Sequence, residues 1–252
     1  MDIKPHQSRY WLHCQGGPEA EVTIRSICKL YGRAQELAQK GERLLSTDEM
    51  TEVQALERKY PDLPLLPGKV ERREFEYIRH GTLGIIVNLD VATGQILAST
   101  CGPRRTESDF LAHIQRTVAT DPKATRWHFV LDNLNIHLSE SLVRYVAEFS
   151  GVTCDLGEKD KCGILHNQVS RAAFLQDESH AIVFHYTPKH CSWMNQIEIW
   201  FSILVRKVLR RGNFVSTEDL GAKVISFISY FNATMAKPFR WTYEGKAKAL
   251  VL

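Results

Sequence analysis

The segment VLDNLNIH, residues 130–137, places Asp132 directly after an apolar run. The residues before it, RWHFVL at positions 126–131, have the composition of a strand that enters a hydrophobic core. A buried carboxylate costs several kcal/mol unless it is paired with a cation or coordinates a metal ion. Asp132, at the end of this strand, therefore predicts a partner that another part of the chain supplies.

The composition is that of a globular protein. The chain has 252 residues, of which 44% are hydrophobic and 24% charged, enough for one large α/β domain or two small ones. The net charge of +3 is too small to establish a polyanionic partner, although Arg104-Arg105 and the basic residues at 206–211 hint at phosphate binding. The sequence has no long apolar run and no signal-peptide core at its start, so we expect a cytoplasmic protein with reduced cysteines and no membrane partner.

Hydrophobic periodicity predicts a mixed α/β sheet flanked by helices. Apolar residues at helical spacing predict one amphipathic helix over residues 18–40. The other predicted elements are, in chain order, a strand at 42–50, a second strand that runs into a proline-punctuated loop over 53–68, a hairpin at 81–100 around Ala92-Thr93-Gly94, a helix opened by a capping box at Thr106 and Asp109, a strand at 126–131, a helix at 139–149, a strand at 181–188, and helices at 193–211 and 217–235.

Residues 151–180 interrupt this rhythm. They are polar and contain glycine, with a short helical patch at 171–175, so we predict a peripheral insertion with few core contacts, whose deletion leaves a folded protein. In the alternative, Cys154, Cys162 and His166 tie together a necessary substructure. Their spacing fits no standard zinc finger, which makes a metal-binding knuckle a minor possibility.

Two further carboxylates are expected at the same edge of the sheet as Asp132. Asp48 lies on the first predicted strand and Glu198 on the helix that follows the last strand. Ligands gather at the carboxyl ends of strands in open α/β sheets, and an oxygen-rich site of this kind suits Mg²⁺. Two such ions can activate a nucleophile and stabilise a leaving oxygen at phosphorus. A single acidic residue near a strand end is more often a cap or a turn residue, so spacing alone does not select these three.

Several long motifs resemble one family, the transposases of the bacterial insertion sequences related to mariner. The resemblance extends from about Lys4 to Lys246. The segments that carry it are STDEMTEVQALER (46–58), VERREFEYIRHGTLGIIVNLDVATG (70–94), VLDNLNIH (130–137), FHYTPKHCSWMNQIEIWFSIL (184–204) and YFNATMAKPFRWTYEGK (230–246).

The resemblance implies a ribonuclease H-like catalytic domain over residues 42–252, preceded by a linker and helix at 1–41. By motif, the catalytic and metal-binding triad is Asp48, Asp132 and Glu198, with Mg²⁺ or Mn²⁺ as cofactor. The implied activity is cleavage of transposon ends followed by attack of the freed 3′-hydroxyl on target DNA, at a TA dinucleotide. The implied partners are DNA, as terminal inverted repeats and target, and a second copy of the chain in an active homodimer.

The chain departs from the family pattern in two ways. Family members usually begin with helix-turn-helix modules that recognise the inverted repeats, and this sequence starts where those modules would end. Asp132 and Glu198 are also 66 positions apart, about twice the common family separation, and the excess falls in residues 151–180. Extra residues between a helix and a strand can loop out without moving the catalytic ends.

Some neighbouring residues allow two interpretations. Glu49 could be a further ligand, but adjacent strand residues point to opposite faces, which favours a structural or exposed role. Asn133, Asn135 and His137 could orient the site or contact phosphate, while capping and turn formation explain the asparagines equally well. The basic residues of the last part of the predicted helix 193–211 fit a DNA-binding face and a merely solvated face equally well; they are Arg206, Lys207, Arg210 and Arg211. We expect the aromatic residues Trp193, Trp200 and Phe201 to lie in the core.

Two other functions remain open from the sequence. The chain could be a catalytically idle DNA-binding or dimerising fragment of a split transposase, which the missing modules favour and the intact triad opposes. It could also be a host nuclease of the same fold, which would have no flanking inverted repeats.

Overall fold

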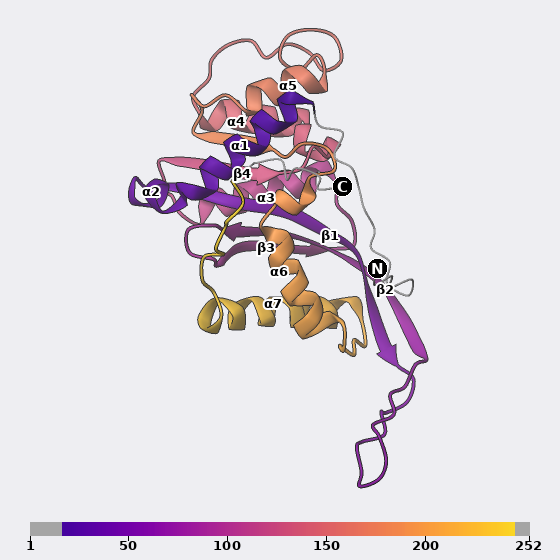
Figure 1. Cartoon of the computed structure of the whole chain (residues 1–252). Coiled ribbons are helices and arrows are strands. Elements are labelled where there is room, and N and C mark those ends of the chain that lie inside the picture. The colour runs from indigo at the N-terminus through magenta and orange to yellow at the C-terminus, as the bar shows by residue number, and fades with distance from the viewer. Residues whose placement is uncertain (1–16, 245–252) are drawn as a thin grey trace, which may run out of the picture.

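The computed structural model describes residues 17–244, which form a five-stranded sheet with helices on both faces (Figure 1). The sheet order is β3-β2-β1-β4-β5, antiparallel from β3 to β1 and parallel from β1 to β5. The strands are β1 (Glu42–Arg58), β2 (Tyr77–Asp90), β3 (Ile96–Gly102), β4 (Arg126–Leu131) and β5 (Ile182–Tyr186). This mixed sheet confirms the predicted fold class.

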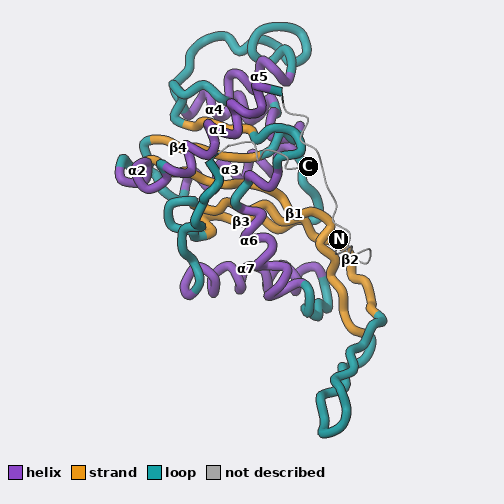
Figure 2. The backbone as a smooth tube through the Cα atoms, in the orientation of Figure 1, coloured by secondary structure: helices purple, strands orange, loops and turns teal. Residues whose placement is uncertain are grey.

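The helices and short turns connect these strands (Figure 2). They are α1 (Pro18–Gly32), α2 (Ala34–Gln39), α3 (Glu107–Ala119), η1 (Asn135–Leu138), α4 (Glu140–Phe149), α5 (Gln168–Leu175), η2 (Ser192–Met194), α6 (Ile197–Leu204), the π-helical turn η3 (Val205–Leu209) and α7 (Thr217–Thr234). No helix within residues 17–244 is both long and apolar enough to span a bilayer.

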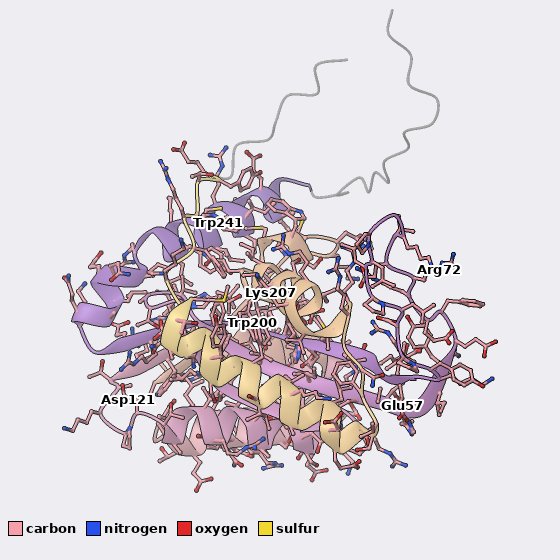
Figure 3. The ribbon with its side chains drawn as sticks, turned by 90° about the horizontal axis from the view of Figure 1, so that it is seen from below. Glu57, Arg72, Asp121, Trp200, Lys207 and Trp241 are labelled. Atoms are coloured by element: carbon pink, nitrogen blue, oxygen red, sulfur yellow. The ribbon has the colours of Figure 1, made fainter. Side chains whose placement is uncertain are left out.

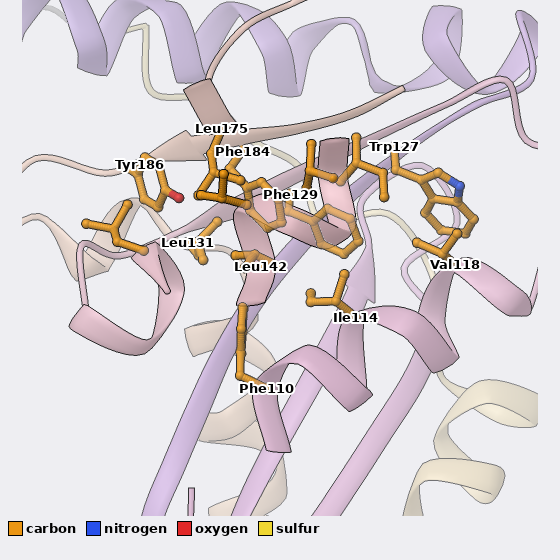
Figure 4. Close-up of a cluster of buried hydrophobic side chains, with 14 of the residues drawn as sticks. Phe110, Ile114, Val118, Trp127, Phe129, Leu131, Leu142, Leu175, Phe184 and Tyr186 are labelled. Atoms are coloured by element: carbon orange, nitrogen blue, oxygen red, sulfur yellow. The ribbon is translucent and has the colours of Figure 1, made fainter. Parts of the chain in front are cut away.

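Alternation along the strands divides the core into two layers. Phe129 and Leu131 of β4 face α3, α4 and α5, where they pack with Phe110 and Leu142 (Figure 4). The other face of the sheet packs against α6 and α7, with Trp200 at the centre of that cluster (Figure 3). Helices α1 and α2 cover the same face beside them, against strand residues such as Leu44 and Val130.

The first strand is longer than the sequence predicts. Residues 42–50 and 53–58 belong to one strand, β1, and the predicted break is a bulge between Met50 and Val53. Glu52 in this bulge has φ of 56°, a conformation that extra residues in a bulge adopt. The two-strand prediction is wrong because the polar pair Thr51-Glu52 interrupts the apolar pattern without ending the pairing.

Two helix predictions also need correction. The helix predicted at 18–40 is divided at Arg33, whose φ of −98° and ψ of 3° end α1 before α2 begins. The helix predicted at 193–211 starts with η2, continues as α6 and widens into the π turn η3. Periodicity alone does not distinguish these local changes of winding, because the apolar side chains keep nearly the same spacing.

Residues 151–180 are not a peripheral insertion with few core contacts, so that prediction is wrong. Leu165 and Leu175 are fully buried and belong to the cluster under α3 and α4. The buried guanidinium of Arg171 donates hydrogen bonds to the carbonyl oxygens of Leu138 at 2.7 Å and Leu165 at 3.0 Å. Leu165 lies in irregular chain, and Arg171 and Leu175 lie on the two-turn helix α5, which is too short to give a clear apolar period.

The predicted turns and caps are confirmed. The hairpin of β2 and β3 turns at residues 91–95, and Gly94 there has φ of +74°. A Cβ atom at Gly94 would lie 2.0 Å from the carbonyl oxygen of Lys237, so the turn also requires the absence of a side chain. Thr106 and Asp109 form the capping box of α3, each side chain accepting from the backbone N–H of the other residue.

The ends of β1 and β2 and the chain between them project from the body as an arm, residues 54–81 (Figures 1 and 2). Glu57 and Arg72 lie on it, to one side of α7 (Figure 3). Several large apolar side chains are exposed along the arm, with Phe75 the most open at 82%.

Candidate active site

Asp48 lies on β1, and Asp132 directly follows β4, the parallel neighbour of β1. The register pairs Ser46 of β1 with Val130 of β4, and each aspartate follows two residues later. Ser46 and Asp48 share a face of β1, the face that meets the start of α6, and Asp132 leaves the carboxyl end of β4 at the same edge of the sheet. Asp132 thus has a neighbouring carboxylate, as the motifs predict.

The third carboxylate, Glu198, lies in the first turn of α6, and the start of this helix is tied to β1. The Asn195 side chain donates through Nδ2 to the carbonyl oxygen of Thr47 at 2.7 Å and to Oδ2 of Asp48 at 3.2 Å. The Ser46 hydroxyl donates to Oδ1 of Asn195 and accepts from the backbone N–H of Ile197 at 2.8 Å. These bonds fix the helix that carries Glu198 beside the strand that carries Asp48.

Sequence reasoning missed Ser46 and Asn195. Both are fully or almost fully buried polar residues, and each stands two or three positions before a triad residue. Small polar residues in otherwise buried segments are the signal that could have identified them, because such side chains need hydrogen-bond partners.

The three carboxylates influence one another electrostatically. Burial raises the pKa of Asp48 to about 7, and the charges of Glu49, Asp132 and Glu198 contribute to this rise. Burial and the charge of Asp132 also raise the pKa of Glu198. Like charges that crowd a partly buried site favour the protonated form of a carboxyl group until a cation is present. The site therefore has unbalanced negative potential.

Asp132 differs because a cation already adjoins it. His137 is fully buried, with Nδ1 3.0 Å from Oδ1 of Asp132 and Nε2 2.8 Å from Oε1 of Glu49. Burial lowers the pKa of His137, but these two partners outweigh it and raise the pKa to about 9. Burial also raises the pKa of Asp132, yet the hydrogen bond and the charge of His137 bring it below its ordinary value.

Glu49 has the structural role that strand alternation favours. It lies on the opposite face from Asp48, and its side chain is only 2% exposed.

Asn133 and Asn135 hold the loop that follows Asp132 through their side-chain hydrogen bonds. Nδ2 of Asn133 donates to the carbonyl oxygen of Thr187 at 2.6 Å, and Oδ1 of Asn135 accepts from Gln168 at 3.0 Å. Both asparagines therefore stabilise the turn after Asp132 and help to orient this part of the site.

The donor set fits a hard divalent cation. It consists of carboxylate oxygens, and the Asp132 side chain remains 43% exposed. Within residues 17–244, however, no three His, Cys, Asp or Glu side chains already form a group that could hold a metal ion. Asp48, Asp132 and Glu198 thus share one region of negative potential, and their assignment as metal ligands stays a prediction.

The basic residues predicted to bind DNA are all exposed beyond Glu198. Of these, Arg206 lies in the same pocket as Glu198, two helical turns further on. Lys207, Arg210 and Arg211 are not among the residues that line this pocket. A second pocket of about 250 Å³ adjoins Asp132 and is lined in part by Asn133, Thr187, Lys189, His190 and Ser192.

The aromatic residues of this segment divide between core and surface. Trp200 and Phe201 are buried as predicted, but Trp193 is 49% exposed, so its core assignment is wrong. Trp193 lies in η2 rather than on α6, and its ring contacts Tyr243 at a centroid distance of 5.1 Å.

The fold resembles that of known transposases. The Mos1 mariner paired-end complex with Mn gives a TM-score of 0.56 at 12% identity, covering 91% of this chain and 60% of that chain. The Mos1 strand transfer complex gives 0.53 at 12% identity, covering 90% and 58%. This chain therefore spans less than two thirds of those proteins, and the likeness shows a shared ribonuclease H-like fold.

The sequence comparison identifies the family. No curated protein sequence matches the chain. Residues 43–221, well over half of the chain, match the family described as DDE superfamily endonuclease. The matched range includes β1, β4 and the start of α6, and with them Asp48, Asp132 and Glu198. The chain belongs to the DDE superfamily endonucleases.

Proposed function

We propose that the chain is the catalytic part of a DNA transposase. It cleaves the ends of its transposon with the help of divalent cations and joins the freed 3′-hydroxyl to target DNA at a TA dinucleotide. The observation that supports this proposal is that Asp48 and Asp132 each follow, by two residues, the in-register pair Ser46 and Val130, while Asn195 and Ser46 tie the start of the helix that carries Glu198 to β1.

Asp48, Asp132 and Glu198 are the residues that would hold Mg²⁺ or Mn²⁺. Such a pair of ions supplies charge stabilisation at phosphorus and activates a water or a hydroxyl as nucleophile. The raised pKa values of Asp48 and Glu198 agree with this assignment, because they reflect burial first and then the negative charge of the neighbouring carboxylates. A similar Mos1 structure is described with Mn, which agrees with the all-oxygen donor set here.

DNA is the proposed partner. The similar solved structures include complexes named as paired-end and strand transfer complexes of Mos1. In this chain, Arg206 is exposed beside Glu198, where it can contact a phosphate next to the one that reacts. Lys189 and His190 line the pocket that adjoins Asp132. A strand that crosses the triad would meet both regions.

A homodimer is part of the proposal, because transposition acts on two DNA ends. The arm at residues 54–81 supports it, since it presents apolar side chains to solvent at several positions. Exposed apolar patches of this kind mark interaction surfaces.

The direct test is a cleavage assay on a supercoiled plasmid that carries the inverted repeats flanking the gene. We expect nicking and joined products with Mg²⁺ or Mn²⁺ and none with EDTA, and sequenced junctions should lie at TA. Ca²⁺ should support DNA binding with little chemistry, because its coordination is longer and less regular. Binding without cleavage under any divalent ion would favour the catalytically idle fragment, and absence of flanking repeats would favour a host nuclease.

A further inference from the structure

The His137 ring lies between two carboxylates, with an acceptor at each nitrogen. Nε2 faces Oε1 of Glu49 at 2.8 Å. Nδ1 faces two oxygens of the same residue, the carbonyl oxygen of Asp132 at 3.1 Å and its Oδ1 at 3.0 Å. Acceptors at both nitrogens require both to donate, so His137 links the backbone and the side chain of Asp132 to Glu49.

This contact determines which oxygen of Asp132 remains free. Oδ1 also accepts the backbone N–H of Leu134 at 3.0 Å. A carboxylate oxygen offers two lone-pair directions, and the two donors use both at Oδ1. Oδ2 accepts no hydrogen bond from any residue between 17 and 244, and the side chain to which it belongs is 43% exposed.

The histidine itself cannot turn away. Its ring is fully buried and stacks at a tilt on Phe110, with the centroids 4.4 Å apart. The carbonyl oxygen of His137 accepts the hydroxyl of Tyr186 at 2.9 Å, which anchors its backbone to β5. Glu49 is equally confined, with a side chain only 2% exposed. A packed ring with two fixed partners gives Asp132 one orientation.

We propose that His137 is a positioning residue that occupies Oδ1 of Asp132 and so presents Oδ2 alone to the cation, with Glu49 holding the ring in place. This inference rests on the proposed function, because it assigns Asp132 as a metal ligand. Partners behind a ligand typically change metal affinity or activity by about 10 to 100-fold when they are removed.

Two substitutions separate positioning from packing. In His137→Asn the amide nitrogen lies near the position of Nδ1, so the donor to Asp132 is kept and the link to Glu49 is lost. In His137→Gln the amide reaches the position of Nε2, so the link to Glu49 is kept and the donor to Asp132 is lost. Both remove the ring and its charge, which makes them matched controls for cavity formation and for electrostatics.

The measurement is Mn²⁺ affinity of the whole chain, from the free-ion signal in electron paramagnetic resonance, together with the nicking rate at saturating Mn²⁺. We expect His137→Asn to bind Mn²⁺ about tenfold more tightly than His137→Gln and to recover most of the nicking rate. Equal affinities and equal rates in the two variants would overturn the positioning role while leaving the proposed function intact.

A second pair keeps the test decisive if both His137 variants unfold in circular dichroism. Glu49→Gln retains an oxygen that accepts from Nε2 of His137, and Glu49→Leu retains only volume. The Gln variant should bind Mn²⁺ more tightly than the Leu variant, again by about tenfold. Equality within this pair contradicts the role, and a wild-type chain that binds no Mn²⁺ overturns both this inference and the proposed function.

Discussion

Asn195 donates a hydrogen bond from Nδ2 to Oδ2 of Asp48 at 3.2 Å, and so connects the strand of one triad residue to the helix of another. The same nitrogen donates to the carbonyl oxygen of Thr47 at 2.7 Å. The position of Glu198 therefore depends on a side chain that is itself uncharged and buried. Asp48 and Glu198 come from a strand and from a helix that is distant in the sequence, so a connection of this kind is needed to fix their relative position.

Replacing Asn195 with alanine should lower both stability and activity. The lost bonds leave Ser46 and the carbonyl oxygen of Thr47 without their buried partner, at a cost of about 1 to 3 kcal/mol in the free energy of unfolding. Urea denaturation measures this loss, and the nicking assay should show a fall in rate because α6 is no longer fixed beside Asp48.

Asn232→Ala is the matched control. Asn232 also makes a pair of hydrogen bonds to backbone, accepting from N of Ile96 and donating to its O, both at 2.8 Å. Its loss should cost similar stability and leave the nicking rate of the remaining folded protein unchanged. Equal losses of rate in both variants would show that Asn195 acts through general stability alone.

The raised pKa of Asp48 predicts a pH-dependent stability in the absence of metal. In the folded chain this carboxyl keeps its proton to about pH 7, against an ordinary value of 3.8. The folded state thus binds more protons in this range, and the free energy of unfolding should fall as pH rises toward 7. From pH 5 to pH 8 the contribution of Asp48 is about 2 to 3 kcal/mol.

Asp48→Asn isolates this contribution. In EDTA, the wild type should lose more stability than this variant between pH 5 and pH 8, as measured by urea unfolding at both values. Other titrating groups are common to the two proteins and cancel in the comparison. Parallel loss in both proteins would mean that burial and the neighbouring charges do not raise the pKa of Asp48.

Arg206 should make an electrostatic contact with DNA. Neutralising one phosphate adds about 0.9 to the slope of log affinity against log salt, so Arg206→Ala should reduce that slope by about one. Arg144→Ala is the control, because Arg144 lies on α4, on the other face of the sheet, and pairs with Glu140 at 2.7 Å. An unchanged slope for Arg206→Ala, measured by fluorescence anisotropy, would support a merely solvated basic face.

The segment 151–180 should be necessary for folding. Leu175→Ala removes a fully buried side chain from the cluster under α4 and should cost about 2 to 5 kcal/mol in the free energy of unfolding. Val169→Ala on the same helix should cost little, because Val169 is 78% exposed. If both variants lost similarly little free energy of unfolding, the segment would be a peripheral insertion after all.

The sequence predicts the regular parts of this fold well and the irregular parts poorly, for a physical reason. The strand at 126–131 and the capping box at Thr106 follow from local chemistry, and both appear as predicted. The bulge at Glu52 and the burial of Leu165 depend on tertiary contacts, which leave no repeating pattern in the sequence.

The site shows the same division. Motif resemblance locates Asp48, Asp132 and Glu198, because each stands in a distinctive segment. Asn195 and His137 act through their side-chain partners, which are 147 and 88 positions away in the chain. Pairing over such distances becomes visible only once the strands and helices are assembled.

The most direct test of the central claim is the comparison of Asp132→Asn with the wild type on a labelled inverted-repeat substrate. Asparagine can keep the two hydrogen bonds at Oδ1 while an amide nitrogen replaces Oδ2, so circular dichroism and urea unfolding should show little change. Loss of the metal-facing oxygen should reduce cleavage with Mg²⁺ or Mn²⁺ by about a thousandfold, which corresponds to about 4 kcal/mol of transition-state stabilisation. Asp155→Asn, at an exposed loop position, should cleave like the wild type. Equal cleavage by Asp132→Asn and the wild type would contradict the assignment of this site as the catalytic centre.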